Sequence, residues 1–256
     1  MDLCIKELKM RTIKVFSIIL AVVSIGIVGT LSSVAAQQKN AIEKPLSSKQ
    51  ESMIAIAAIA AKGNLPKLKE ELHKGLEAGL TINQVKESLI HLYAYAGFPR
   101  SIRGLQTFMT VLDERKATGI NDEIGLKASL ISDERSKYER GKAILEKLTG
   151  VQETASKTGY AAFAPEIEVF LKEHLFADIF ERDVLTYAER ELVTVSVLSS
   201  IGGVEPMLRS HLNICLNIGI ATNQLQQFIE TLKSVIGKKE AKAAHKVLDE
   251  VLKSKI

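Results

Sequence analysis

The sequence has very few cysteines, with only Cys4 and Cys215 among its 256 residues. Cys4 lies in a predicted signal peptide, so Cys215 is expected to be the single cysteine of the mature chain. An intrachain disulfide is then impossible, and a thiol–disulfide cycle that needs two cysteines in one chain is excluded.

The sequence also lacks a marked excess of charge of either sign. Its formal net charge of +4 falls to +2 when residues 1–36, which hold four basic and two acidic residues, are removed. No basic stripe remains, so we expect no nucleic-acid partner. Alternation of polar and apolar residues, the sign of a half-buried strand, is missing as well. We therefore predict an all-α fold.

The N-terminal segment has the pattern of a secretory signal peptide. Arg11 and Lys14 precede an apolar run over residues 15–31, and small residues follow as far as Ala36. We predict a signal peptide over 1–36, cleavage near Ala36, and a periplasmic or secreted mature protein. An N-terminal membrane anchor is the alternative. Because the run of about 17 residues is at the short limit for a membrane span, we expect no stable membrane insertion after cleavage.

The strongest internal pattern is a duplication. When residues 51–112 are moved by 140 positions they fall on residues 191–252 without a gap, and thirteen pairs are identical. The identical pairs are Glu51/Glu191, Gly63/Gly203, Pro66/Pro206, Leu68/Leu208, Leu72/Leu212, Leu76/Leu216, Gly79/Gly219, Asn83/Asn223, Gln84/Gln224, Leu92/Leu232, Gly97/Gly237, Val111/Val251 and Leu112/Leu252. This pattern predicts two copies of one helical unit.

The duplication gives the expected organisation of the chain. We predict a first repeat over 37–112, a linker over 113–134, and a second repeat with an N-terminal helical extension over 135–256. The first helix of each repeat, near 52–62 and 192–201, is apolar nearly all round, which is typical of a buried helix. Such helices have more apolar surface than one four-helix unit can bury, which favours a homo-oligomer.

The second copy contains the first candidate site residues. His211 and Cys215 lie one turn apart on the same face of a predicted helix. An imidazole there is either partly desolvated and chemically active or a core histidine bonded to backbone carbonyls. Glu191 either compensates the dipole of its own helix or orients His211. Cys215 is either a small buried hydrophobe or a redox thiol.

The first copy contains the other candidates, Tyr93, Tyr95 and Arg100, around a tight turn at a helix start. Two phenols and a guanidinium in this arrangement suit the binding of an organic carboxylate. Alternatively, the tyrosines fill the core and Arg100 is solvated. The second copy has lost these aromatic residues, so the two copies look complementary: one retains the histidine helix and the other the tyrosine and arginine turn.

Several short motifs in both halves resemble the carboxymuconolactone decarboxylase family, which includes the alkylhydroperoxidase D-like proteins. The motifs are Glu77-Ala78-Gly79-Leu80-Thr81, Glu87, Tyr95-Ala96-Gly97-Phe98-Pro99, Glu139-Arg140-Gly141, Leu148-Thr149-Gly150, Phe176 to Arg182, Leu185, Arg190 to Thr194, and the spacing from His211 to Gly219. The resemblance implies two tandem alkylhydroperoxidase D-like helical repeats, assembled as a homo-oligomer such as a trimer that imitates a hexamer of single units.

The resemblance also implies what the protein does. The peroxidase branch of the family uses a Cys-x-x-Cys pair just before the histidine, and the matching positions here are Val204 and Met207. The decarboxylase branch acts on a lactone carboxylic acid without a metal or organic cofactor. We therefore expect a lyase for a small organic acid with no cofactor.

The same resemblance assigns roles to the candidates. His211 would be the proton shuttle and Glu191 its partner, while Arg100, Tyr95 and Tyr93 would bind the substrate. Two other functions stay open. One is a thiol-dependent peroxidase in which Cys215 reacts alone and an external thiol resolves it, and the other is a non-catalytic helical oligomer.

Overall fold

The described residues of this computed structural model, 44–154 and 156–255, form helices and no strand, which confirms the predicted all-α fold. The predicted signal peptide, 1–36, lies outside the described residues. Within them, no helix is both long and apolar enough to cross a bilayer. All the helices below belong to one compact unit, Pro45–Ile256.

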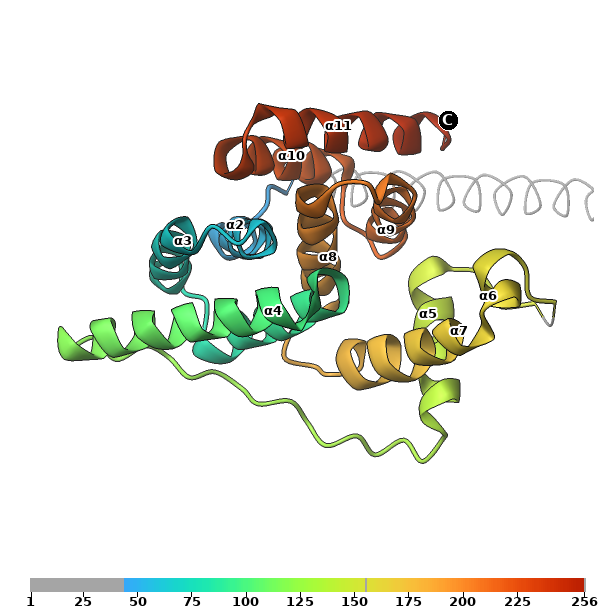
Figure 1. Ribbon diagram of the computed structural model, residues 1–256, viewed down its shortest axis with the longest axis horizontal. Helices are drawn as coiled ribbons and strands as arrows, with labels where there is room; N and C mark the ends of the chain where they lie inside the picture. Colours follow the sequence, from blue (N-terminus) through green and yellow to red (C-terminus); the bar gives the residue numbers. More distant parts are fainter. Residues whose placement is uncertain (1–43, 155, 256) are drawn as a thin grey trace, which may run out of the picture. The chain divides into compact units, whose positions relative to one another are not determined.

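The first repeat consists of α2 (Ser48–Lys62), α3 (Leu65–Glu77) and α4 (Ile82–Ala117) (Figure 1). A capping box formed by Ser47 and Gln50 starts α2, and Gly63 ends it in the left-handed conformation, at φ 73°. Gly97, at φ 79° and ψ 162°, bends α4 into two arms. The first repeat therefore has four helical segments, as the sequence pattern predicts.

The second repeat consists of α8 (Tyr187–Ile201), α9 (Glu205–Asn217), α10 (Thr222–Ile236) and α11 (Lys238–Lys253). A shift of 140 positions carries the bounds of α3 onto those of α9. It also places the bend at Gly97 on Gly237, the residue that separates α10 from α11. The duplication read from the sequence is thus a duplication of structure.

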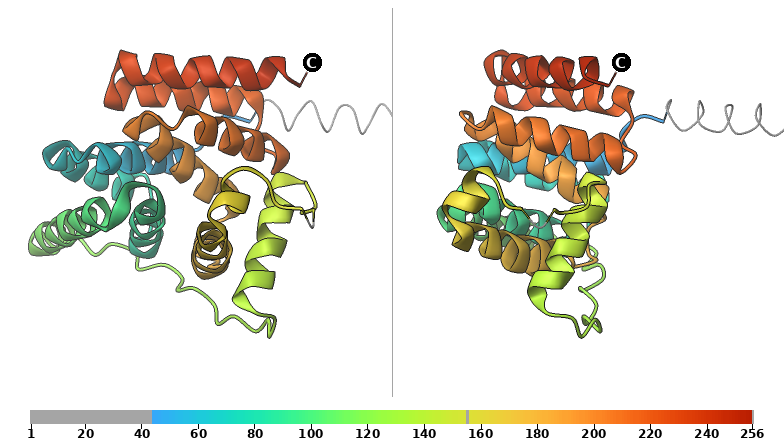
Figure 2. Two further views of the ribbon diagram at one scale, coloured as in Figure 1. Left: turned by 45° about the vertical axis from the view of Figure 1, so that its right-hand side comes forward. Right: turned by 90° about the vertical axis from the view of Figure 1, so that its right-hand side faces the viewer.

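Four further helices lie between the repeats: α5 (Lys137–Thr149), α6 (Gly159–Phe163), α7 (Pro165–Phe170) and η1 (Leu171–Phe180), a wider, π-type helix. The second arm of α4 continues to Ala117, five residues into the predicted linker 113–134. The chain is then extended as far as α5. Figure 2 shows α5 beside η1, and the two pack closely together.

The centre of the fold is the contact between α2 and α8, the first helices of the two repeats. Residues 53–61 of α2 and residues 190–200 of α8 are all buried. Ile54 and Ala58 of α2 pack into the core of the second repeat, while Val193 and Val197 of α8 pack into the core of the first. The apolar surface that one four-helix unit cannot bury is therefore covered by the other unit of the same chain.

The contact between α5 and η1 leads to a prediction about stability. A Cβ added at Gly141 would lie 1.9 Å from the backbone oxygen of Lys172, so the two helices would have to separate. We expect Gly141→Ala to lower the free energy of unfolding by about 1–3 kcal/mol, as overpacking does. Chemical denaturation measures this change.

The control is Gly104→Ala, where the added Cβ meets only the movable methyl ends of Leu89. Alanine also has the better helix propensity, by about 1 kcal/mol. This variant should be less affected than Gly141→Ala. Equal destabilisation of the two would contradict the close approach of α5 and η1.

Candidate functional site

His211 and Glu191 form a direct pair between α9 and α8. The distance from His211 Nδ1 to Glu191 Oε2 is 2.8 Å. The Glu191 side chain is fully buried, whereas that of His211 is 13% exposed. With Glu191 as a carboxylate, which only accepts hydrogen bonds, Nδ1 carries the proton. Nε2 of His211 makes no hydrogen bond to the described residues.

Tyr95 completes this pair from the first arm of α4. Its ring lies edge-on to His211, with the centroids 5.7 Å apart. Its buried hydroxyl has no hydrogen-bond partner among the described residues, and neither has Glu191 Oε1. Burial raises the pKa of Tyr95, and the charge of Glu191 raises it further. The nearby side chain of Thr194 lowers this pKa by a smaller amount. The phenol therefore stays neutral and keeps its proton to donate.

A buried polar network supports this site from behind. Glu87 of α4 accepts hydrogen bonds from Arg190 Nη2 and Arg182 Nε, each at 2.8 Å. Arg190 Nη1 lies 3.3 Å from His91 Nδ1, and His91 Nε2 lies 2.8 Å from the hydroxyl of Thr194. The network therefore joins α4 of the first repeat to α8 of the second.

The network fixes the tautomer of His91. A guanidinium only donates hydrogen bonds, so Nδ1 of His91 must be the acceptor from Arg190. The hydroxyl of Thr194 donates to the backbone oxygen of Arg190 at 3.0 Å, so it accepts from Nε2 of His91. His91 is thus a neutral imidazole with its proton on Nε2, an assignment that rests on the hydrogen-bond pattern.

The charges of the network agree with this assignment. Burial lowers the pKa of His91 well below its ordinary value, and the charges of Arg190 and His211 add to the effect. Burial alone would raise the pKa of Glu87, but the hydrogen bonds from Arg182 and Arg190 lower it overall. Removal of one partner of such a buried ion pair destabilises a protein by about 3–5 kcal/mol, because the other charge is left buried without a partner. The pair of Glu87 and Arg190 thus links α4 to α8.

Arg100 and Tyr93, two of the three predicted substrate-binding residues, lie away from His211. Arg100 is exposed, and its guanidinium lies against Gly63. It lines a hollow with Ser200, near the C-terminal end of α8, about 14 Å along that helix from Glu191. Tyr93 stacks on Phe98 with ring centroids 4.4 Å apart. Of the three residues, only Tyr95 contacts His211.

Known sequences place this arrangement in a family. The sequence pattern of the carboxymuconolactone decarboxylase family matches residues 32–108 and 165–250 of the chain, so that each repeat is matched once. The chain belongs to the carboxymuconolactone decarboxylase family. This carboxymuconolactone decarboxylase family member is also similar to the 4-carboxymuconolactone decarboxylase of Acinetobacter baylyi, with 25% identity over 122 residues. That match covers 47% of this chain and 90% of the relative.

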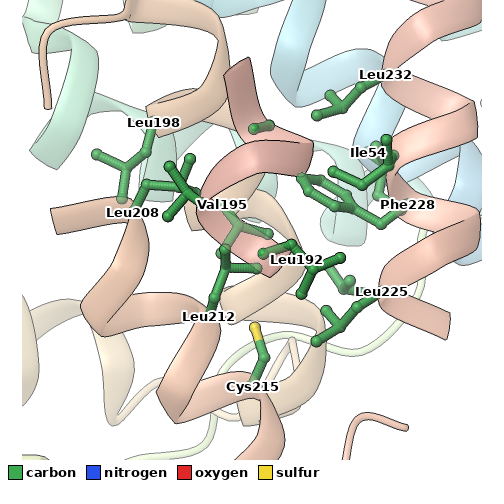
Figure 3. Close-up of a cluster of buried hydrophobic side chains, with 14 of the residues drawn as sticks. Ile54, Leu192, Val195, Leu198, Leu208, Leu212, Cys215, Leu225, Phe228 and Leu232 are labelled. Atoms are coloured by element: carbon green, nitrogen blue, oxygen red, sulfur yellow. The ribbon is translucent and has the colours of Figure 1, made fainter. Parts of the chain in front are cut away.

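Cys215 of this family member does not have the surroundings of a redox thiol. Its side chain is fully buried, and its sulfur lies among Leu192, Leu212 and Leu225 (Figure 3). Burial, together with the charge of Glu191, raises the pKa of Cys215 well above its ordinary value. Peroxide reacts with an accessible thiolate. The structure therefore favours the packing role for Cys215 and argues against the redox role.

Sequence reasoning missed the buried polar network behind His211. Glu87 and Arg190 stand among the family motifs, but the sequence pattern assigns them no part in the site, and it does not single out His91. The signal was present in the duplication, because the positions equivalent to these three residues are Gln227, Gln50 and Thr231. Where one copy has an ionisable residue and the equivalent position of the other copy has an uncharged one, the first copy can form a charged network that the second cannot.

The buried His91 predicts how stability depends on pH. Below about pH 6.5 the unfolded chain binds a proton at this position, whereas the folded chain does not, because burial lowers the pKa of His91. The free energy of unfolding should therefore fall as the pH is lowered, by up to about 1.4 kcal/mol per pH unit from this residue. Glutamine can make both hydrogen bonds without titrating, so His91→Gln should flatten the dependence between pH 7.5 and 5.

Urea denaturation at several pH values tests this expectation. The matched control is His245→Gln, which makes the same change on the exposed face of α11 and should leave the slope unchanged. An identical slope for His91→Gln and the unaltered chain would show that His91 does protonate in the folded state.

Cys215 should resist thiol reagents as long as the chain is folded. In a Cys4→Ser background, we expect 5,5′-dithiobis(2-nitrobenzoate) to label native Cys215 at least about a hundredfold more slowly than the unfolded chain, because labelling requires local opening. The control places a cysteine at the half-exposed Met207 on the same helix, as Met207→Cys with Cys215→Ser. Rapid labelling of native Cys215 would restore the redox interpretation.

Proposed function

We propose that this protein is a cofactor-free carboxy-lyase that acts on a small lactone carboxylic acid. Membership of the carboxymuconolactone decarboxylase family supports the class of reaction, and the relative from Acinetobacter baylyi is named as a 4-carboxymuconolactone decarboxylase. The observation that carries the proposal is the pair formed by His211 and the buried Glu191, which leaves Nε2 of the imidazole free.

The reaction needs few groups. The bond between the ring carbon and the carboxylate carbon breaks, carbon dioxide leaves, and the electron pair passes into the unsaturated lactone. A proton must then be delivered to carbon. In the proposal, protonated His211 delivers it from Nε2 while Glu191 holds the ring through Nδ1, an arrangement of an acid and a group that orients it.

Tyr95 would stabilise the charge that develops on the lactone oxygen. Its hydroxyl is buried, neutral and without a hydrogen-bond partner among the described residues, so it can donate to an incoming oxygen without first breaking another bond. A donor placed in this way is worth most in a site that excludes water. Glu191 Oε1, on the carboxylate that holds His211, also lacks a hydrogen-bond partner among the described residues.

An assay with 4-carboxymuconolactone, followed by ultraviolet absorbance and by release of carbon dioxide, tests the proposal. We expect turnover by the unaltered protein and a loss of about 10²- to 10⁴-fold in kcat for His211→Gln, the range of general acid catalysis. Tyr95→Phe should lower kcat by about 10²-fold, as the loss of one oxyanion donor does.

Two control variants change residues outside the proposed site. Cys215→Ser should keep its turnover, which a thiol mechanism would not allow. His245→Gln removes an exposed imidazole and should also be active. Full activity in a folded His211→Gln protein would contradict the site, and absence of turnover by the unaltered protein would contradict the reaction.

A further inference from the structure

A hollow away from His211 can be understood from the internal duplication. An open hollow of about 480 Å³ lies where α2, α3 and α10 meet. It is lined by Ser48, Glu51, Ser52, Ala55, Glu71, Lys74, Gln227, Glu230, Thr231, Ser234 and Val235. None of these residues belongs to the site at His211.

A shift of 140 positions relates this hollow to the site at His211. Glu51 corresponds to Glu191, and Glu71 corresponds to His211. On α10, Gln227, Thr231 and Val235 correspond to the three site residues Glu87, His91 and Tyr95 of α4. The hollow is thus the counterpart of the candidate active site, built from the opposite halves of the two repeats.

The difference in side-chain size explains why this counterpart is open. Val235 is smaller than Tyr95, and Thr231 is smaller than His91. On α2, Ser52 and Ala55 stand at the positions where α8 has Leu192 and Val195. At each of these four positions the side chain that lines the hollow is smaller than its counterpart in the other copy. The smaller side chains therefore leave open space here.

The charge of the hollow is the opposite of what an organic acid needs. Its charged lining consists of three carboxylates, on Glu51, Glu71 and Glu230, and one ammonium, on Lys74. Glu71 is the notable group, because its side chain is only 9% exposed although it carries a carboxylate. Oε1 of Glu71 accepts from Lys74 at 2.9 Å, and its Oε2 accepts no hydrogen bond from the described residues.

The partner of Glu71 is a replaceable one. Lys74 follows Glu71 by three residues on the same helix, and its side chain is 61% exposed. An ion pair between residues three apart on one helix stabilises a protein little. An ammonium group from another molecule can take the place of Lys74 at Glu71 while Lys74 turns into solvent, and the hydroxyls of Ser52 and Thr231 offer further acceptors.

We propose that this hollow is a second binding site, which takes a small organic amine. The carboxylate of Glu71 pairs with its ammonium group, and the space left by the smaller side chains of α2 and α10 holds its short hydrocarbon part. The proposal does not depend on the proposed lyase activity, because the two sites share no residue and the test measures binding.

Isothermal titration calorimetry of the full chain tests the charge preference. The probes are 1,4-diaminobutane, the neutral butane-1,4-diol and the dianion succinate, which have similar length. We expect saturable binding of the diamine at one site per chain, and no saturable binding of the diol or of succinate at the same concentrations. Absence of diamine binding, or equal binding of the diol, would overturn the proposal.

Variants locate the binding in the hollow. Glu71→Gln should weaken diamine binding about tenfold or more, the effect of losing one charge-assisted hydrogen bond. Lys74→Met removes the competing ammonium and should tighten binding. Val235→Tyr, which restores the side chain of the other copy, should abolish it by filling the space.

The matched control is Glu166→Gln, which removes the same charge from an exposed position on α7 outside the hollow. It should leave the affinity unchanged. An equal loss in Glu166→Gln and Glu71→Gln would mean that the diamine responds only to the net charge of the protein, and would overturn the assignment to this hollow.

Discussion

The contact between α2 and α8 is the constraint on which the rest of the structure depends. Each of these helices is the first of its repeat and is buried on nearly every side, so neither repeat can bury all of its apolar surface by itself. When the two helices pack against each other, residues of each enter the core of the other repeat. The two halves of the chain are therefore one folding unit, and every functional group between them is positioned by this contact.

The same contact explains why the candidate site is built from both repeats. α8 supplies Glu191 and Arg190, and α4 of the other repeat reaches them with Tyr95, His91 and Glu87. Burial excludes water from these groups, so an ion pair and a fixed imidazole tautomer can hold the helices in place. The site can bring His211 and Tyr95 together because the two copies have kept different residues.

Periodicity and the duplication predicted most of the fold, because helix starts, glycine stops and apolar faces are local signals. They left open whether Glu191 pairs with His211 or only compensates the dipole of its helix. The family resemblance implied the pair, and the structure places Glu191 Oε2 2.8 Å from His211 Nδ1. The position of Arg100 was not predictable in this way. It follows the bend at Gly97, where the direction of the chain changes and spacing along the sequence no longer reports distance. The arginine therefore lies near the C-terminal end of α8, while Tyr95, just before the bend, reaches His211.

The duplication also explains how one chain comes to hold two unlike versions of the same set of positions. In an assembly of identical units, each site would contain the same residues, and a change in one would be a change in all. Once the two units are joined, Glu71 can stand where the other copy has His211, and Val235 where the other has Tyr95, without altering the first site. The central α2–α8 contact preserves the frame of both, because it depends on buried apolar residues and not on the polar ones. The polar residues can thus differ between the copies while the fold stays constant.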